Sequence, residues 1–121
     1  MFLRLFLLFV IITIIDFIYL YFIKDYFAHQ ISIIQGAPLK IDYFSALLCY
    51  ILLVVGLYYF IIKPKRSIFD AFILGLVIYG VFETTSKALF SKWSWTTVFI
   101  DSVWGAILFA LTTYVYRLVI Q

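Results

Sequence analysis

Four apolar runs, each long enough to cross a membrane, constrain what this chain can fold into. They lie at residues 5–23, 43–62, 68–90 and 97–116. A helix needs about 20 mostly apolar residues to span the hydrocarbon core of a bilayer. Because four such runs fill most of the 121 residues, the sequence predicts an all-α fold. We expect a single transmembrane domain over residues 1–121, built as a four-transmembrane-helix bundle.

The composition supports a membrane protein rather than a soluble one. Hydrophobic residues make up 67% of the chain and charged residues only 12%, which is about half the charged share of a soluble protein. A soluble domain of this size leaves too much surface in water to hide so many apolar side chains. The basic residues are scattered near the ends of the runs, so we expect membrane lipids as partners and no nucleic acid.

The sequence lacks the spacings that hold metals, phosphates or a catalytic nucleophile. It has no Cys-x-x-Cys pair and no glycine-rich phosphate loop, and nothing links its single histidine, His29, to a serine. Its single cysteine, Cys49, lies in an apolar run and is typical of a small packing residue. We therefore expect no metal and no cofactor, and the sequence leaves open whether the protein is an enzyme.

The loops predict an orientation for a multi-pass protein. Four spans place Met1, residues 63–66 and Gln121 on one side of the membrane. That side also carries a concentrated set of basic residues, namely Arg4, Lys63, Lys65, Arg66 and Arg117. Short loops rich in lysine and arginine favour the cytoplasmic side. The sequence therefore predicts that both termini are cytoplasmic.

The connections carry further local signals. Ser67, followed three residues later by Asp70, predicts the capped start of the third helix. The long connection at residues 24–42 is predicted to lie on the membrane surface or to cover the outer mouth of the bundle. Trp93 and Trp95, in the short third connection, are interpreted as interfacial tryptophans.

Three acidic residues interrupt the apolar runs at similar depth. At 1.5 Å of rise per residue, Asp16, Glu83 and Asp101 all fall in the outer half of a bilayer core about 30 Å thick. Each costs about 2.5–3.5 kcal/mol if it faces lipid. We therefore expect these side chains to face inward, to pair, or to take up protons.

The third run contains other polar residues close to its acid. Glu83 and Lys87 are four residues apart, with the acid on the N-terminal side, which favours an ion pair along a helix. Tyr79 shares that stripe. Thr85 and Ser86 are able to bond to the backbone or to another helix.

The other two acids share a local pattern. Asp16 is followed three residues later by Tyr19, and Asp101 is followed three residues later by Trp104. Each aromatic side chain is expected to donate a hydrogen bond to the acid one turn before it. Gly105 and neighbouring small residues favour close approach of another helix. The candidate polar pocket therefore comprises Asp16, Tyr19, Tyr79, Glu83, Thr85, Ser86, Lys87, Asp101 and Trp104.

The element Asp101-Ser-Val-Trp104-Gly105 resembles the fourth helix of the domain of unknown function 2177 family, a group of predicted four-span membrane proteins. That family carries a Tyr-Asp-Leu-Thr-Asn-x-Ala type signature in its third helix. Here Thr85 and Ala88 match the signature, Glu83 stands for its acid, Ser86 for its amide, and Lys87 is an added charge. Trp93, Pro64 and the Asp16-to-Tyr19 element resemble further family features. The resemblance implies the four-helix layout and this choice of residues, and it implies no particular reaction.

Three functions remain open at this point. One is a lipid- or small-molecule-binding or modifying protein, in which Glu83 acts as an acid or base positioned by Asp101 and Asp16. Another is a small proton-coupled transporter subunit that pairs as a homo-oligomer. The last is a non-catalytic structural or assembly protein in which the acids hold the helices together.

Overall fold

The computed structural model describes residues 1–37 and 40–120, and every regular element in them is helical. Four helices are long and apolar enough to cross a membrane. This confirms the predicted all-α, four-helix fold. The elements are α1 (Phe2–Gln35), α2 (Tyr43–Leu57), continued by the π-helical turn η1 (Tyr58–Ile62), α3 (Ile68–Leu89) and α4 (Trp95–Ile120).

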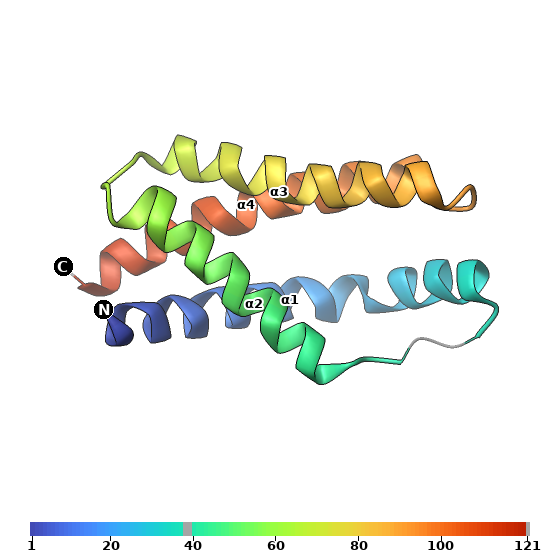
Figure 1. Ribbon diagram of the computed structural model, residues 1–121, viewed down its shortest axis with the longest axis horizontal. Coiled ribbons are helices and arrows are strands. Elements are labelled where there is room, and N and C mark those ends of the chain that lie inside the picture. Colours follow the sequence, from blue (N-terminus) through green and yellow to red (C-terminus); the bar gives the residue numbers. More distant parts are fainter. Residues whose placement is uncertain (38–39, 121) are drawn as a thin grey trace.

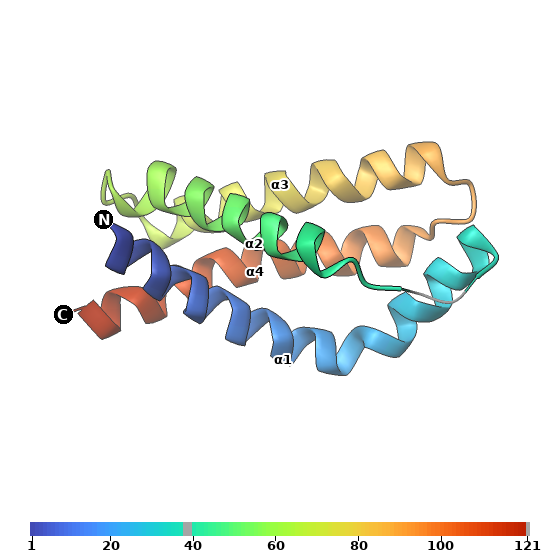
Figure 2. The same ribbon diagram turned by 60° about the horizontal axis from the view of Figure 1, so that its bottom comes forward.

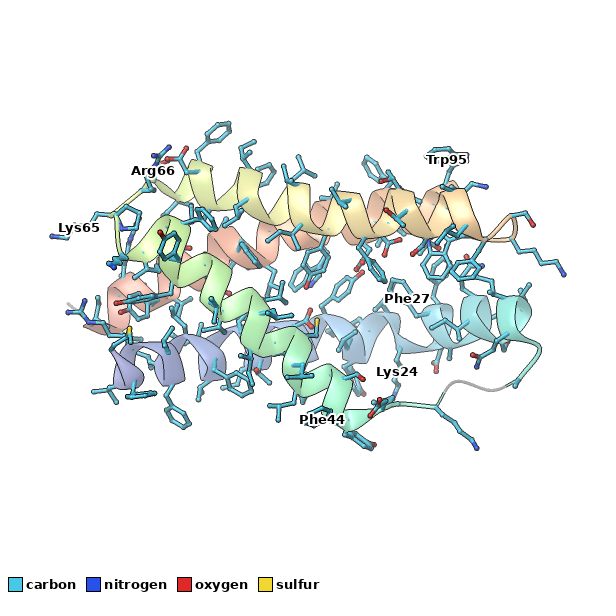
Figure 3. All side chains as sticks on the ribbon, viewed as in Figure 1. Lys24, Phe27, Phe44, Lys65, Arg66 and Trp95 are labelled. Carbon is cyan, nitrogen blue, oxygen red and sulfur yellow. The ribbon has the colours of Figure 1, made fainter. Side chains whose placement is uncertain are left out.

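Helices α1, α3 and α4 run roughly along one long axis, and α2 crosses it obliquely (Figure 1). Both termini lie at one end together with the turn between η1 and α3, and we call this the terminal end. The turn between α3 and α4 lies at the opposite end, which we call the hairpin end. Figure 3 places Lys65 and Arg66 at the terminal end and Trp95 at the hairpin end. In both ribbon views α3 and α4 lie side by side (Figures 1 and 2).

Helix α1 is longer than the sequence predicted. It continues through residues 24–35, which we had assigned to the connection. Its 34 residues give a length of about 51 Å, more than the hydrocarbon core of about 30 Å. The last turns of α1 rise towards the α3–α4 turn (Figure 2), where the Gln30 side chain donates to the Lys92 carbonyl at 2.8 Å. The extension thus covers the hairpin end of the bundle.

The extension ends at Gly36, the first residue suited to stop it. No glycine or proline interrupts residues 24–35. Gly36 has a φ of 67°, and its N–H bonds to the Ser32 carbonyl at 2.9 Å. This left-handed conformation favours glycine because it has no Cβ. The sequence prediction ended this helix at residue 23, where the apolar run ends, and placed Gly36 inside the connection.

A close approach between α3 and α4 depends on two glycines. A Cβ on Gly75 would run into the carbonyl of Gly105, and a Cβ on Gly105 would run into the ring of Tyr79. Small residues at such a crossing let two backbones pack closely in a membrane. The contact also presses Tyr79 against α4, one turn from Asp101.

The terminal half of the bundle has an apolar core. Its fully buried side chains include Leu8, Ile12, Leu57 and Phe109, none of which is exposed to solvent. Other large apolar side chains point outward, and Phe22, for example, is 80% exposed. Such a surface suits lipid and not water, in agreement with the composition.

The turn at the terminal end closes η1 with a recognisable hydrogen-bond pattern. The Arg66 N–H bonds to the Ile61 carbonyl at 2.8 Å, and the Lys65 N–H bonds to the Ile62 carbonyl at 3.1 Å. This is a Schellman motif, in which the residue after the helix adopts a left-handed conformation. Lys65 has this conformation, with a φ of 58°, although it is not glycine. Pro64 precedes it and cannot continue the helix.

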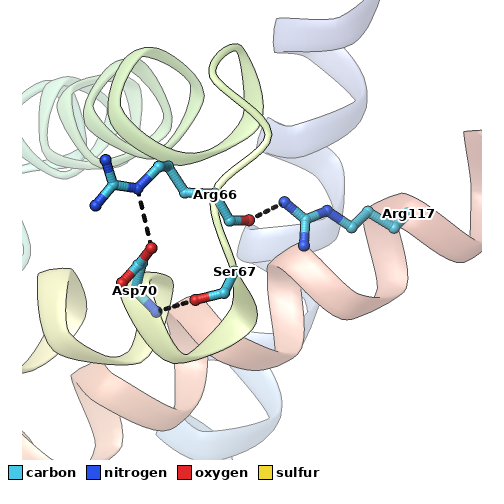
Figure 4. Close-up of polar contacts among 4 residues, drawn as sticks. All are labelled: Arg66, Ser67, Asp70 and Arg117. Atoms are coloured by element: carbon cyan, nitrogen blue, oxygen red, sulfur yellow. Dashed lines mark hydrogen bonds and ion pairs between the residues drawn. The ribbon is translucent and has the colours of Figure 1, made fainter.

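The predicted cap of α3 is present (Figure 4). The Ser67 hydroxyl accepts a hydrogen bond from the Asp70 N–H at 3.0 Å. The Asp70 carboxylate pairs with the Arg66 side chain at 2.9 Å. The Arg117 guanidinium donates to the Arg66 carbonyl and thereby ties α4 to this turn.

Candidate functional site

Three buried or half-buried acids from three helices meet in the hairpin half of the bundle. Asp16 of α1 is 7% exposed, Glu83 of α3 is 0% exposed, and Asp101 of α4 is partly buried. Asp101 lies close enough to interact electrostatically with both Glu83 and Asp16. We call these residues the acid cluster. Asp16 and Glu83, the two buried acids, must be held by donors, because an uncompensated buried charge is very unfavourable.

The donors of Asp16 and Asp101 come from opposite helices. The Trp104 indole N–H of α4 donates to Asp16 Oδ1 at 2.8 Å, and the Tyr19 hydroxyl of α1 donates to Asp101 Oδ1 at 3.3 Å. The Tyr19 and Trp104 rings stack between the helices, with their centres 4.4 Å apart and their planes 4° from parallel. The prediction that each acid bonds to the aromatic residue on its own helix is therefore wrong.

The crossed pairing follows from helix direction. Helix α1 runs from the terminal end to the hairpin end, and α4 runs back (Figure 1). In antiparallel helices with the same Asp-x-x-aromatic spacing, the acid of one helix lies level with the aromatic donor of the other. The aromatic donor of each helix therefore bonds to the acid of the other helix, and neither acid is bonded by the aromatic residue of its own motif.

A second donor to Asp16 comes from α2. The Tyr50 hydroxyl bonds to Asp16 Oδ2, so both carboxylate oxygens of Asp16 are occupied. Tyr50 was not among the predicted site residues, because it stands in an apolar run with no charged residue near it to single it out. The acid cluster thus draws on all four spanning helices.

Glu83 is held by a residue that we had placed at the membrane interface. The Trp93 indole N–H donates to Glu83 Oε1 at 2.9 Å, and Trp93 is only 7% exposed. Trp93 therefore faces the protein interior, because the tight α3–α4 turn folds this side chain back under the end of α3. Trp95, which is 67% exposed, agrees with the interfacial interpretation.

The second oxygen of Glu83 is left without a donor. Glu83 Oε2 is buried and accepts no hydrogen bond from the described residues. The neighbouring Asp101 is another acid, and its charge interacts with that of Glu83. The Glu83 side chain is therefore able to accept one further hydrogen bond.

The remaining polar residues of α3 do not join the acid cluster. The expected Glu83–Lys87 ion pair is absent among the described residues, and the Lys87 ammonium lies 5.7 Å from the centre of the Trp95 ring. A long lysine side chain reaches readily for the membrane interface. Ser86 bonds to the Phe82 carbonyl at 3.0 Å on its own helix, and Thr85 is exposed.

A crevice leads to the acid cluster from the side of the bundle. It has a volume of about 220 Å³. Helix α3 packs mainly on α4, and α2 mainly on α1, so the crevice lies between two helix pairs. Its wall is apolar except for a carboxylate, a thiol and a tyrosine. The lining residues are Cys49 and Leu53 of α2, Ile78, Tyr79 and Phe82 of α3, and Asp101 of α4.

A polar network at the hairpin end holds the extension of α1 in place. The buried Gln30 side chain accepts from the Thr97 hydroxyl at 3.1 Å and donates to the Lys92 carbonyl. The Tyr26 hydroxyl bonds to the same threonine at 2.8 Å. This network fixes the turn that carries Trp93. The sequence analysis missed it because Tyr26 and Gln30 lay in the segment assigned to a connection.

The site contains carboxylates but no metal-binding geometry. Within residues 1–37 and 40–120, no three histidine, cysteine, aspartate or glutamate side chains are grouped as metal ligands. The oxygens of the acid cluster accept hydrogen bonds from indole and phenol groups instead. The arrangement is suited to accepting hydrogen bonds.

A family model described as "Predicted membrane protein (DUF2177)" matches residues 1–117. The chain belongs to this family. The match extends through all four spanning helices, and it confirms the resemblance drawn from the Asp101-to-Gly105 element. Comparisons with curated proteins and with solved structures give no match.

Proposed function

We propose that the protein binds an amphiphilic molecule, with the polar group at the acid cluster and the apolar part in the crevice. The crevice is the observation that carries this proposal. It has an apolar wall, with Asp101 as its acidic residue and Tyr79 beside it. Sites for small molecules typically combine an apolar wall with a few fixed polar groups.

The polar group is expected to be a cation or a hydroxyl. Asp101 accepts from Tyr19 through one oxygen, and Glu83 has one buried oxygen without a donor. An ammonium or hydroxyl group would supply the missing donor. Hydrogen bonds to charged groups are stronger than those between neutral groups, which favours such a ligand over one that has only acceptors.

The route into the site is expected to be lateral. The crevice opens between helix pairs, and Phe82 at its edge is 60% exposed. At the hairpin end, the network around Gln30 ties α1 to the α3–α4 turn. A molecule already dissolved in lipid would therefore reach Asp101 without passing that end.

The same pair of acids supports a proton-transfer step on the bound molecule. Glu83 and Asp101 are neighbouring acids whose charges interact. When one of two neighbouring carboxyl groups carries a proton and the other does not, the pair provides both a general acid and a general base. The Trp93 and Tyr19 donors keep the two side chains oriented for that role.

The native Cys49 gives a direct test, since it is the single cysteine of the chain and lines the crevice. Protein in phosphatidylcholine vesicles is alkylated with N-phenylmaleimide in the presence of dodecylamine or dodecyl methyl ether. We expect the amine to slow alkylation and the ether, which has no donor, to leave the rate unchanged. Asp101→Asn should weaken the protection by about tenfold or more, as a hydrogen bond to a charged group contributes about 1.5–3 kcal/mol.

A matched control separates the site from general charge effects. Asp42→Asn removes an exposed acid outside the spans and should leave the protection intact. Equal alkylation rates with amine and ether in the wild-type protein would contradict the proposal. So would protection that is unchanged in Asp101→Asn.

A structural role is the second candidate, and one observation favours it. Each acid accepts a hydrogen bond from a residue outside its own helix, through Trp104 and Tyr50 to Asp16, Tyr19 to Asp101 and Trp93 to Glu83. Buried polar groups of this kind are able to fix one packing arrangement. This candidate predicts that neutralising an acid changes the melting temperature and leaves Cys49 protection unaltered.

The orientation of the protein is part of the same proposal. The terminal end carries Arg4, Lys63, Lys65, Arg66 and Arg117, and a basic end of this kind favours the cytoplasm. The acid cluster would then lie in the outer leaflet. Cysteines introduced near the termini should react with a membrane-impermeant maleimide only after cells are permeabilised.

A further inference from the structure

A second cavity lies at the terminal end, far from the acid cluster along the bundle axis. Its volume is about 400 Å³, and we call it the basic pocket. Its wall combines three cations, a tyrosine and two isoleucines. The lining residues are Arg4, Ile62, Lys65, Tyr116, Arg117 and Ile120.

The three cations come from separate parts of the chain. Arg4 lies in the first turns of α1, Lys65 in the turn before α3, and Arg117 near the end of α4. The left-handed backbone of Lys65 belongs to the Schellman motif that places this residue at the pocket. Gathering like charges is unfavourable unless an anion accompanies them.

No acid balances these cations within residues 1–37 and 40–120. Asp70 is the nearby carboxylate, and it pairs with Arg66 on the other side of the turn (Figure 4). Neither Arg4, Lys65 nor Arg117 forms an ion pair in those residues. The Arg117 guanidinium donates to the Arg66 carbonyl, which fixes its position and leaves its charge unneutralised.

Tyr116 provides an independent indication of a ligand. It is 1% exposed, and its hydroxyl has no hydrogen-bond partner among the described residues. Buried hydroxyl groups are normally satisfied, because an unpaired donor in an apolar setting is unfavourable. An oxygen of a ligand in the basic pocket would accept this hydrogen bond.

We propose that the basic pocket binds the phosphate group of an anionic membrane lipid. Phosphate oxygens accept hydrogen bonds from guanidinium, ammonium and phenol groups together. The pocket lies where the apolar spans end, at the depth of lipid headgroups, and basic pockets at this depth are suited to anionic lipids. Ile62 and Ile120 would contact the glycerol and the first methylenes. Inorganic phosphate shares the headgroup chemistry and lacks those apolar contacts.

The test is native mass spectrometry of the full chain purified in detergent. Phosphatidylglycerol, phosphatidylcholine and inorganic phosphate are added separately, and their adducts are distinguished by mass. The variant Arg4→Gln/Lys65→Gln is compared with Lys24→Gln/Lys92→Gln, which removes two cations that do not line the basic pocket. We expect the first pair to reduce phosphatidylglycerol binding about 25-fold, or about fivefold for each cation, and the second pair to leave it nearly unchanged.

The hydroxyl gives a second readout at constant charge. Tyr116→Phe should reduce phosphatidylglycerol binding about threefold, in the range of one lost hydrogen bond. It should raise the melting temperature without added lipid slightly, since it removes a buried hydroxyl that has no partner among the described residues.

The arms of the experiment also distinguish the source of the phosphate. One outcome is that inorganic phosphate forms adducts, that these disappear in Arg4→Gln/Lys65→Gln, and that no lipid adducts form. This outcome would support a phosphate site and contradict the proposal that the ligand is a lipid. Equal losses in both double variants would show an effect of net charge alone and overturn the site. Binding of phosphatidylcholine as tight as that of phosphatidylglycerol would overturn the requirement for an anionic lipid.

Discussion

The two halves of this bundle are held together by different forces. The terminal half packs apolar side chains such as Leu8, Ile12 and Phe109, all of them fully buried. The hairpin half joins its helices through hydrogen bonds to buried acids, including Trp104 to Asp16 and Trp93 to Glu83. Lipid is as apolar as leucine, so apolar burial alone gives little preference for one helix partner. Shape complementarity between apolar side chains therefore holds the terminal half together. Directed polar contacts determine which helices pair in the hairpin half.

The largest expected effect is a loss of packing in the terminal half. Phe109 is fully buried in the apolar core cluster, and Phe109→Ala should lower the free energy of unfolding by about 3–5 kcal/mol. Unfolding in mixed micelles, followed by circular dichroism, measures this change. In the protein that remains folded, Cys49 protection should equal that of the wild type, because Phe109 does not line the crevice. Altered protection would mean that the halves are coupled.

The next effect is the loss of directed contacts in the hairpin half. Asp16→Ala leaves the Trp104 and Tyr50 donors without their acceptor. We expect a loss of about 2–4 kcal/mol in the free energy of unfolding, since each unsatisfied buried donor costs about 1–3 kcal/mol. Unlike Phe109→Ala, this change should also alter Cys49 protection in the folded protein, because it frees the side chain of Tyr50, which is next to Cys49 in α2.

A double-mutant cycle sharpens this contrast. Trp104→Phe removes the donor and keeps an aromatic ring. In the Asp16→Ala background, Trp104→Phe should cost clearly less than in the wild type, with a coupling energy of about 0.5–3 kcal/mol. Additive losses would contradict a direct bond between the two side chains. Thr85→Ala is the matched control, because Thr85 is exposed and outside the cluster.

Most of the fold follows from the sequence, because apolar runs of spanning length have a single common explanation. The second and third predicted spans, residues 43–62 and 68–90, agree closely with α2–η1 and α3. The error lies in α1, where residues 24–35 are polar enough to read as a loop. They remain helical because nothing stops them before Gly36. Hydropathy identifies the residues that contact lipid, and it does not identify the residue at which a helix ends.

The candidate site was harder to predict than the fold. The choice of the three acids needed only their burial cost, and the sequence supplied that. Their partners depended on how the helices pair, so Tyr19 and Trp104 were assigned to the wrong acids. Trp93 was missed as a partner of Glu83 because its position depends on the turn between α3 and α4. Tyr50 was missed because a tyrosine in an apolar helix does not by itself indicate which helix its hydroxyl faces. Side-chain partners across helices require the helix packing, which the sequence alone leaves open.

A smaller effect is expected at the turn of the terminal end. Lys65 has a φ of 58°, a conformation that costs a residue with a Cβ about 1–2 kcal/mol. Lys65→Gly should therefore raise the free energy of unfolding by about 0.5–1 kcal/mol, measured by chemical denaturation in lipid-free detergent. Lys63→Gly is the control, since Lys63 has a helical φ of −59°, and it should lower that energy. Destabilisation by Lys65→Gly would contradict the motif.

The smallest effect contrasts an exposed acid with the buried ones. The Ser45 hydroxyl donates to Asp42 at 2.6 Å, and this bond, with a backbone contribution from Ser45, lowers the pKa of Asp42 below its ordinary value of 3.8. Stabilisation from a lowered pKa is complete above that ordinary value and is lost as the pH falls through the lowered one. We expect a slight fraying of the start of α2 below about pH 4, detected by amide exchange, and no such dependence in Asp42→Asn.

The central claim is that the acids of the hairpin half form a ligand site and do more than hold helices together. Native mass spectrometry of the protein, purified with the molecules that accompany it, tests this most directly. We predict that the wild type carries a non-covalent amphiphile that Glu83→Gln and Asp101→Asn lose, while Asp42→Asn retains it. If the variants at Glu83 and Asp101 fold normally and carry the same molecules as the wild type, the acids are structural and the account is contradicted.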